Sequence, residues 1–178
     1  MKKIIAATTV ALALATTASA ELKVGLGYNL SEALNGGQTS IRVPIDLVDI
    51  GNGLRIEPEL GFGSNTYTDD PADTTDTINT IAVGGYYNLW AVEKVSFYAG
   101  GRLAITNETD EKYDYTKLRV DSKDYTTTGI QGLFGAEYGI TDDFTVAAQA
   151  GLEINTGDRE SVGTVGHVIL RYFFVGGS

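Results

Sequence analysis

Few residues in this chain are of a type that does acid, base or nucleophilic chemistry. The chain has one histidine, His167, and no cysteine, so thiolate chemistry and disulfide bonds are excluded. A catalytic histidine acts together with a nucleophile and an acid, but neither G-x-S-x-G nor H-E-x-x-H occurs. We therefore interpret His167 as an interior polar residue satisfied by hydrogen bonds, and we expect no catalytic residue.

Carboxylates gather in the segment TDDPADTTD. They are Asp69, Asp70, Asp73 and Asp76. Carboxylate oxygens suit calcium, but this spacing lacks the glycine and the terminal glutamate of an EF-hand loop. We interpret the segment as a solvated loop and expect neither a metal site nor a bound cofactor.

A second polar segment, 107–126, mixes acidic and basic residues with Tyr113, Tyr115 and Tyr125. It is long enough to continue as strands beyond the body of the fold and to touch a partner. Loops that bind ligands have this composition, and so do loops that are only solvated. The identity of any partner stays open.

Nine further charges alternate with apolar residues at a period of two. These charged residues are Arg42, Arg55, Arg102 and Arg171, with Asp46, Glu57, Glu59, Glu137 and Glu153. Paired carboxylates could serve general acid and base chemistry, but a narrow interior offers no open cleft for a substrate. We expect Arg42, Arg55, Arg102 and Arg171 to pair with Glu57, Glu59, Glu137 and Glu153, which would leave no continuous pore.

The elements that position these charges are strands, because no segment shows a sustained helical period. Eight runs alternate between apolar and polar positions, each about as long as a tilted membrane-spanning strand. The runs are 22–31, 39–49, 54–66, 79–89, 95–106, 127–140, 144–155 and 163–174.

The connections between the runs alternate in length. Short turns occupy 49–53, 90–94 and 141–143, and longer polar segments occupy 32–38, 68–78, 107–126 and 156–161. Short turns at one end and longer loops at the other predict an all-β, eight-stranded antiparallel up-and-down barrel. We place a single domain at residues 21–178.

The first twenty residues predict export. A basic MKK start, a short apolar stretch and the small residues ASA are typical of a signal peptide, which we expect to be cleaved after Ala20. Removing Lys2 and Lys3 leaves 11 basic against 23 acidic residues. This acidic balance argues against a nucleic-acid partner, which needs a basic patch. No later stretch approaches 18 consecutive apolar residues, so we expect no transmembrane helix.

Three features indicate that the polar face of each strand points inward and the apolar face toward lipid. The polar face is rich in glycine and alanine, which fit the narrow interior of a small barrel. Its charges are nearly balanced, as a closed interior requires. Aromatic residues gather near the strand ends, as in the girdles of membrane barrels. They are Tyr28, Phe62, Tyr67, Tyr87, Trp90, Phe97, Phe134, Tyr138, Phe144, Tyr172 and Phe174.

The last strand carries a more specific signal in the stretch GHVILRYFF. Val168, Leu170, Tyr172 and Phe174 share one phase, while His167 and Arg171 share the other. This stretch resembles the C-terminal assembly signal of bacterial outer-membrane barrels, although four residues, VGGS, follow Phe174. The whole chain resembles the small eight-stranded class that includes the OmpA transmembrane domain and the OmpX and Ail proteins.

The resemblance implies a monomeric protein in the bacterial outer membrane, surrounded by lipid and lipopolysaccharide and recognised by the barrel-assembly machinery through its last strand. It implies a non-enzymatic role in envelope integrity or in surface interaction through the loops. The alternative is a narrow channel. A lipid A-modifying enzyme is a third reading, but such barrels need a histidine aimed at lipid or set in a loop, whereas His167 is expected to point inward.

Overall fold

The computed structural model describes residues 22–31, 38–47, 53–68 and 73–175, and this part of the chain contains nine strands. They are β1 (Leu22–Asn29), β2 (Gln38–Arg42), β3 (Ile45–Leu47), β4 (Leu54–Tyr67), β5 (Thr74–Val92), β6 (Val95–Asp114), β7 (Arg119–Gly139), β8 (Phe144–Gly157) and β9 (Ser161–Val175). No helix among these residues is long and apolar enough to cross a membrane. The expected signal peptide, 1–20, lies outside the described residues.

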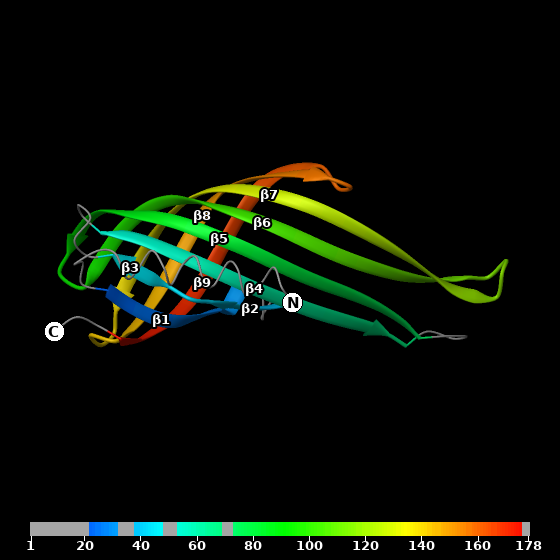
Figure 1. Ribbon diagram of the computed structural model, residues 1–178, viewed down its shortest axis with the longest axis horizontal. Coiled ribbons are helices and arrows are strands. Elements are labelled where there is room, and N and C mark those ends of the chain that lie inside the picture. Colours follow the sequence, from blue (N-terminus) through cyan, green and yellow to red (C-terminus); the bar gives the residue numbers. More distant parts are fainter. Residues whose placement is uncertain (1–21, 32–37, 48–52, 69–72, 176–178) are drawn as a thin grey trace.

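The strands form one closed antiparallel sheet. From β3 to β9 each strand pairs with the next in the chain, and β9 pairs with β1 to close the ring (Figure 1). The up-and-down barrel expected from the alternating runs is therefore confirmed. Closure leaves no exposed sheet edge around the wall of the barrel.

The second expected run is divided into two short strands, β2 and β3, on either side of Val43 and Pro44. Proline has no backbone N–H and interrupts the ladder. The backbone still bridges the interruption, because Val43 N donates to Pro58 O at 2.9 Å and Pro44 O accepts from Gly25 N at 3.0 Å. The register across the interruption is unchanged, so β2 and β3 together take one of the eight places in the ring.

The two ends of the barrel differ. At the short-turn end, β5 turns into β6 at Glu93 and Lys94, and residues 140–143 join β7 to β8. At the other end, β6 and β7 stay paired as far as Asp114 and Arg119 (Figure 1). Most of the expected 107–126 loop is therefore strand, and it projects from the body as a hairpin. We call this end the hairpin end.

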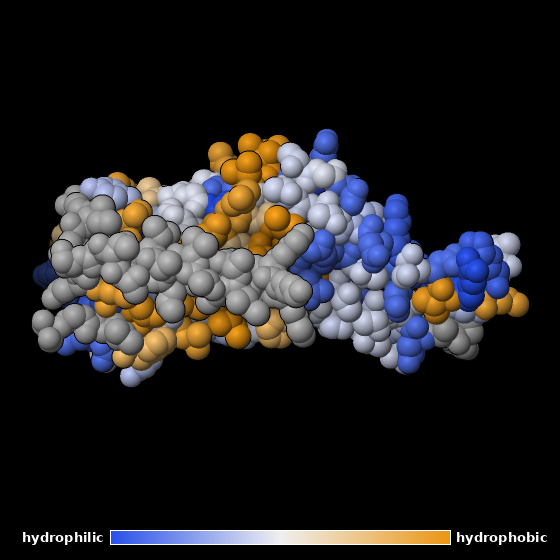
Figure 2. Space-filling model, in the orientation of Figure 1, coloured by the Kyte–Doolittle hydropathy of each residue, from blue (hydrophilic) through white to orange (hydrophobic). Residues whose placement is uncertain are grey.

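The wall separates apolar and polar side chains as its period of two requires. Leu103, Ile130 and Phe134 are about half exposed on the outside, whereas Arg102, Gln131 and Glu137 of the same strands are buried inside. Figure 2 shows hydrophobic side chains over part of the wall, and mostly hydrophilic side chains with a few hydrophobic ones over the projecting end. Among the aromatic residues, Trp90 stacks on Phe97 with ring centroids 4.9 Å apart.

Inward-facing glycines make room for two large interior side chains, Tyr86 and Tyr98. A Cβ at Gly84 would lie 2.6 Å from the Tyr86 ring, and one at Gly135 would lie 2.6 Å from the Tyr98 ring. The two rings meet edge to face, with centroids 5.6 Å apart. The glycine content of the polar face thus lets tyrosines lie against the inner wall, where larger neighbours would collide with them.

Candidate functional site

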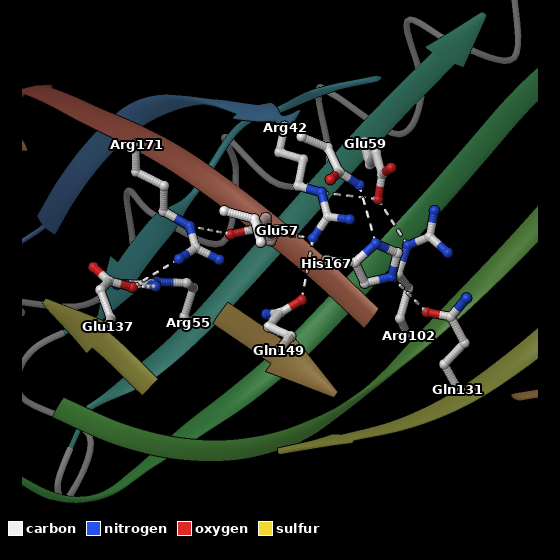
Figure 3. Close-up of polar contacts among 12 residues, drawn as sticks. Arg42, Arg55, Glu57, Glu59, Arg102, Gln131, Glu137, Gln149, His167 and Arg171 are labelled. Atoms are coloured by element: carbon white, nitrogen blue, oxygen red, sulfur yellow. Dashed lines mark hydrogen bonds and ion pairs between the residues drawn. The ribbon is translucent and has the colours of Figure 1, made fainter. Parts of the chain in front are cut away.

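The interior charges form one chain in which arginines and acids alternate, drawn in part in Figure 3. In order along the barrel, the chain runs Asp46, Arg55, Glu137, Arg171, Glu57, Arg42, Glu59, Arg102. Each member is bonded to the next. With as many acids as arginines, the chain is neutral as a whole, which limits the cost of holding charges in a closed interior.

Two of these links join direct cross-strand neighbours. Asp46 of β3 is opposite Arg55 of β4, and the Arg55 Nε lies 2.5 Å from the Asp46 Oδ1. Arg42 of β2 is opposite Glu59 of β4, with 3.3 Å from the Arg42 Nε to the Glu59 Oε2. Cross-strand neighbours on one face lie close enough for such pairs to form from register alone.

Of the other five links, Arg42 to Glu57 again joins the neighbouring strands β2 and β4, and four join strands that are not neighbours. Arg171 of β9 reaches Glu57 of β4 at 2.8 Å and Glu137 of β7 at 2.7 Å. Arg55 also contacts Glu137. These contacts tie β4, β7 and β9 together across the interior, and both Arg42 and Arg171 have no exposed surface at all.

The expected pairing is confirmed for all four arginines, and for Glu57, Glu59 and Glu137. It is wrong for Glu153, which accepts a hydrogen bond from Gln131 at 2.7 Å instead of meeting an arginine. Asp46 is the fourth acid of the chain in its place. Glu153 has the same inward parity as the others but sits nearer the hairpin end, so parity alone could not separate the two acids.

His167 lies inside the barrel, as expected. Its Nδ1 is 3.0 Å from the Asn29 amide nitrogen, and its Nε2 is 3.5 Å from the Gln131 side-chain oxygen. The ring is buried beside Arg102, at that end of the charge chain, and its polar contacts are the side chains of Asn29 and Gln131 (Figure 3). A base directed at a lipid substrate would have to face outward, so this geometry does not suit lipid chemistry.

An apolar cluster fills the interior beside the charge chain. It contains Tyr86, Tyr98, Leu133, Ala147 and Ile169, all nearly or fully buried. Sequence parity placed Ile169 inside but did not point to a packed cluster. The cluster and the charge chain share the strands β7 and β9, because Leu133 is on the strand of Glu137 and Ile169 is on the strand of Arg171.

At the Arg102 end of the charge chain the interior opens into a polar cavity of about 320 Å³. Arg102, Gln131 and His167 line it next to the charge chain, and Gln38 and Asn155 line it near the hairpin ends of β2 and β8. We call it the vestibule.

Among the described residues, no group of three or more His, Asp or Glu side chains is placed to hold a metal ion. The expected acidic loop is only partly described, because Asp69 and Asp70 lie outside the described residues.

A cluster around Arg159 fastens the base of the hairpin to the turn between β8 and β9. The Arg159 Nη1 lies 2.7 Å from both Glu108 carboxylate oxygens, and its Nη2 lies 2.5 Å from the Asp110 Oδ2. Its guanidinium also lies 4.1 Å from the centroid of the Tyr125 ring. Multiple bonds from one planar guanidinium hold an ion pair better than a single exposed contact does.

The tip of the hairpin is closed by Asp114. Its Oδ1 accepts the backbone N–H groups of Thr116 and Lys117 at 2.8 and 3.1 Å, and its Oδ2 lies 2.9 Å from the Lys117 ammonium. Hydrogen bonds from the Lys117 ammonium and from these backbone groups lower the pKa of Asp114 to about 2. The carboxylate therefore stabilises the turn while it is charged.

We expect this turn to depend on pH. Because the pKa of Asp114 is lowered in the folded tip, its contribution is complete above the ordinary aspartate pKa of 3.8 and is lost as the pH falls toward about 2. A carbon-detected NMR titration should place the Asp114 midpoint near 2. Protection of the Thr116 and Lys117 amides, corrected for intrinsic exchange, should fall over the same range. A midpoint near 3.8 would contradict the geometry of the turn, and Asp114→Asn serves as the pH-insensitive control.

Comparison with known proteins agrees with this geometry. The sequence model of a family described as the outer membrane protein β-barrel domain matches residues 4–166. The chain belongs to this family. It is an outer-membrane β-barrel, so the outward face described above is its lipid-facing surface, and the barrel spans the membrane between the short-turn end and the hairpin end.

Solved structures of small outer-membrane barrels share the fold. Neisserial surface protein A aligns with a TM-score of 0.53 at 16% identity, covering 86% of this chain and 95% of that one. Ail, the attachment invasion locus protein of Yersinia pestis, aligns with a TM-score of 0.50 at 14% identity, covering 88% of this chain and all of that one. No curated protein matches the chain in sequence. At these identities the likeness shows the fold alone.

Proposed function

We propose that the protein is a non-enzymatic outer-membrane barrel that meets partners at the cell surface through its projecting β6–β7 hairpin. The observation that carries this proposal is the hairpin itself. Pairing of β5 to β6 begins at Thr77 and Thr109, and pairing of β7 to β8 begins at Thr127 and Gly157. Beyond those points no backbone pairing covers the outer edges of the hairpin among the described residues, although Thr75 and Asp76 of β5 still exchange hydrogen bonds with Glu111.

Exposed strand edges and exposed apolar side chains are the two features through which sheets join other proteins. The hairpin has both. Tyr115 is 70% exposed and Leu118 is 75% exposed at its tip, and Val120 is exposed beside them. Large apolar side chains in water, outside the lipid-facing band, favour a protein partner that covers them.

The charge of the hairpin distinguishes it from a site for sulfated polysaccharide. Ail of Yersinia pestis has been crystallised with a heparin analogue, sucrose octasulfate. Here the residues from 108 to 124 include six acids and four bases. The acids are Glu108, Asp110, Glu111, Asp114, Asp121 and Asp124, and the bases are Lys112, Lys117, Arg119 and Lys123. An excess of acids disfavours a polyanion, so we propose a protein partner.

The test replaces residues 110–123 with Asn-Gly. Thr109 and Asp124 are cross-strand partners, so a two-residue turn can close the shortened hairpin. Bacteria carrying the shortened barrel should lose adhesion to cultured host cells, compared with bacteria that carry equal amounts of the full chain. Resistance to detergent should be unchanged. Unchanged adhesion with lost detergent resistance would instead support a role in envelope integrity.

Several further features belong to this proposal. We propose that residues 1–20 are a cleaved signal peptide, that the barrel-assembly machinery recognises β9 through Tyr172 and Phe174, and that the monomeric barrel lies among lipid and lipopolysaccharide. The outward position of Tyr172 and Phe174 supports the second point. The amino-terminal sequence of the membrane-inserted protein tests the first, since an uncleaved Met1 would contradict it.

The interior supports a barrel that neither conducts nor catalyses. The apolar cluster lies beside the charge chain in the interior, and His167 is held inside the wall. We expect no unitary conductance from the refolded protein in planar bilayers. Lipid A should have the same mass in cells with and without the gene. Stable conductance steps would favour the narrow channel.

A further inference from the structure

The vestibule is a feature of the interior that neither the surface hairpin nor the stability of the wall explains. Its volume, about 320 Å³, falls at the lower end of the range of about 300–1,000 Å³ seen for small-molecule sites. Side chains that form hydrogen bonds make up most of its lining, including Gln38, Thr80, Thr106 and Asn155. A lining of this kind suits a polar solute and does not suit an acyl chain.

Two lining residues carry fixed charges of opposite sign, Arg102 and Glu153. They lie in one row of the wall, because Arg102 is opposite Gln131 and Gln131 is opposite Glu153. Neighbouring strands are about 4.8 Å apart, so the two backbones are roughly 10 Å apart with the Gln131 amide between them. The wall thus presents a cation, a neutral amide and an anion in sequence.

Both charged groups have bonding capacity left for a solute. The Arg102 Nε donates to the Glu59 Oε2 at 2.7 Å, and among the residues drawn in Figure 3 the two terminal amino groups of its guanidinium make no contact. The Glu153 Oε1 accepts from Gln131, and a carboxylate has about four acceptor positions. Glu153 is partly exposed, whereas the acids of the charge chain that face Arg42 are buried.

From this arrangement we propose that the vestibule binds small zwitterionic solutes of the amino-acid class. The carboxylate of the solute meets the terminal amino groups of Arg102, and its ammonium group meets Glu153. Gln131, Thr106 and Asn155 supply neutral hydrogen bonds. A solute with both charges can bond the terminal amino groups of Arg102 and the carboxylate of Glu153 at once, whereas a simple anion or a simple cation can bond only one of the two, so the zwitterion fits better than either.

The absence of cysteine from the chain allows a direct test. Ala104 lines the vestibule and is 5% exposed, and a cysteine there should react with a small methanethiosulfonate reagent in the refolded full chain. Millimolar L-serine or L-glutamine should slow this reaction by at least about fivefold, which corresponds to substantial occupancy of the site. Acetate and methylammonium at the same concentration should have little effect.

Two controls separate binding from general effects. A cysteine at Thr116, at the exposed tip of the hairpin, should react equally fast with and without either amino acid. Glu153→Gln combined with Ala104→Cys should remove the protection, because Glu153 lies outside the charge chain and its loss leaves the chain intact. In the unsubstituted barrel, L-serine should shift the NMR signals of the Gln131 side-chain amide, which keeps the test valid should the cysteine variant not fold.

The proposal is overturned by any of three results. One is a folded Ala104→Cys barrel that does not react, which would mean that solutes do not reach the vestibule. Another is reaction without protection by either amino acid, together with an unshifted Gln131 signal. The third is equal protection by acetate, which would mean that Arg102 alone binds the solute.

Discussion

Replacing Arg171 with methionine should destabilise the refolded barrel by about 3–5 kcal/mol, because it leaves two buried acids short of a cation. Arg171 has no exposed surface and bonds both Glu57 and Glu137 near the middle of the charge chain. Its removal divides the chain and leaves one excess negative charge beside the apolar cluster. Methionine replaces the aliphatic stem of arginine and lacks only the guanidinium group beyond it, so less of the loss should come from a cavity than with alanine.

Arg102 provides the control for Arg171, because the two arginines differ in their position within the charge chain. Arg102 is at one end, and its only neighbour in the chain, Glu59, keeps a bond to Arg42 when Arg102 is removed. Arg102→Met should therefore cost less than Arg171→Met. Combining it with Glu59→Gln restores neutrality, so the double variant should cost less than the sum of the two single changes. Urea unfolding from lipid vesicles measures the free energies of unfolding of Arg171→Met, of Arg102→Met, of Glu59→Gln and of the double variant. Equal losses for Arg102→Met and Arg171→Met would mean that the interior is hydrated and that the charges act independently.

The direction of each interior side chain could be read from the sequence because a strand has a period of exactly two residues. Arg42, Glu57 and Arg171 alternate with apolar neighbours. In a closed barrel the side chains at alternate positions of a strand all face the interior or all face outward. Pairing could not be read in the same way. Arg171 and Glu137 are on strands separated by β8, and a contact across the interior depends on shear and on the reach of long side chains.

The length of the hairpin could not be predicted from the sequence, because the alternation of apolar and polar residues does not continue along it. Within the membrane, lipid on one side and protein on the other impose alternation on β6 and β7. Beyond Asn107 both faces of the ribbon meet water, so residues such as Lys112 and Ser122 carry no apolar phase although they are cross-strand neighbours of Asp121 and Glu111. The division at Pro44 could have been suspected from proline alone, but the unchanged register across it depends on hydrogen bonds to both neighbouring strands.

The second large effect is expected on the lipid-facing surface, where Leu103→Arg should destabilise the barrel by about 2–4 kcal/mol. Leu103 is 47% exposed and points outward from β6, between Gly101 and Ile105 of the same face. From Phe97 in the aromatic girdle to Asn107 the strand rises roughly 33 Å. A tilt of about 40° makes this about 25 Å across the membrane, which matches the apolar band of outer-membrane barrels. Leu103 lies near the middle of that band.

A matched substitution at Asn79 separates the cost of placing arginine deep in the membrane from the cost of placing arginine in a strand. Asn79 of β5 is the cross-strand partner of Asn107 and faces outward beyond the apolar band. Asn79→Arg should cost no more than about 1 kcal/mol, because an arginine near the interface keeps its charge in water. Guanidinium unfolding of both variants in lipid vesicles gives the two free energies. Equal costs at Leu103 and Asn79 would mean that the outward face does not meet hydrocarbon at Leu103, and the proposed depth of the barrel in the membrane would have to be shifted along its axis.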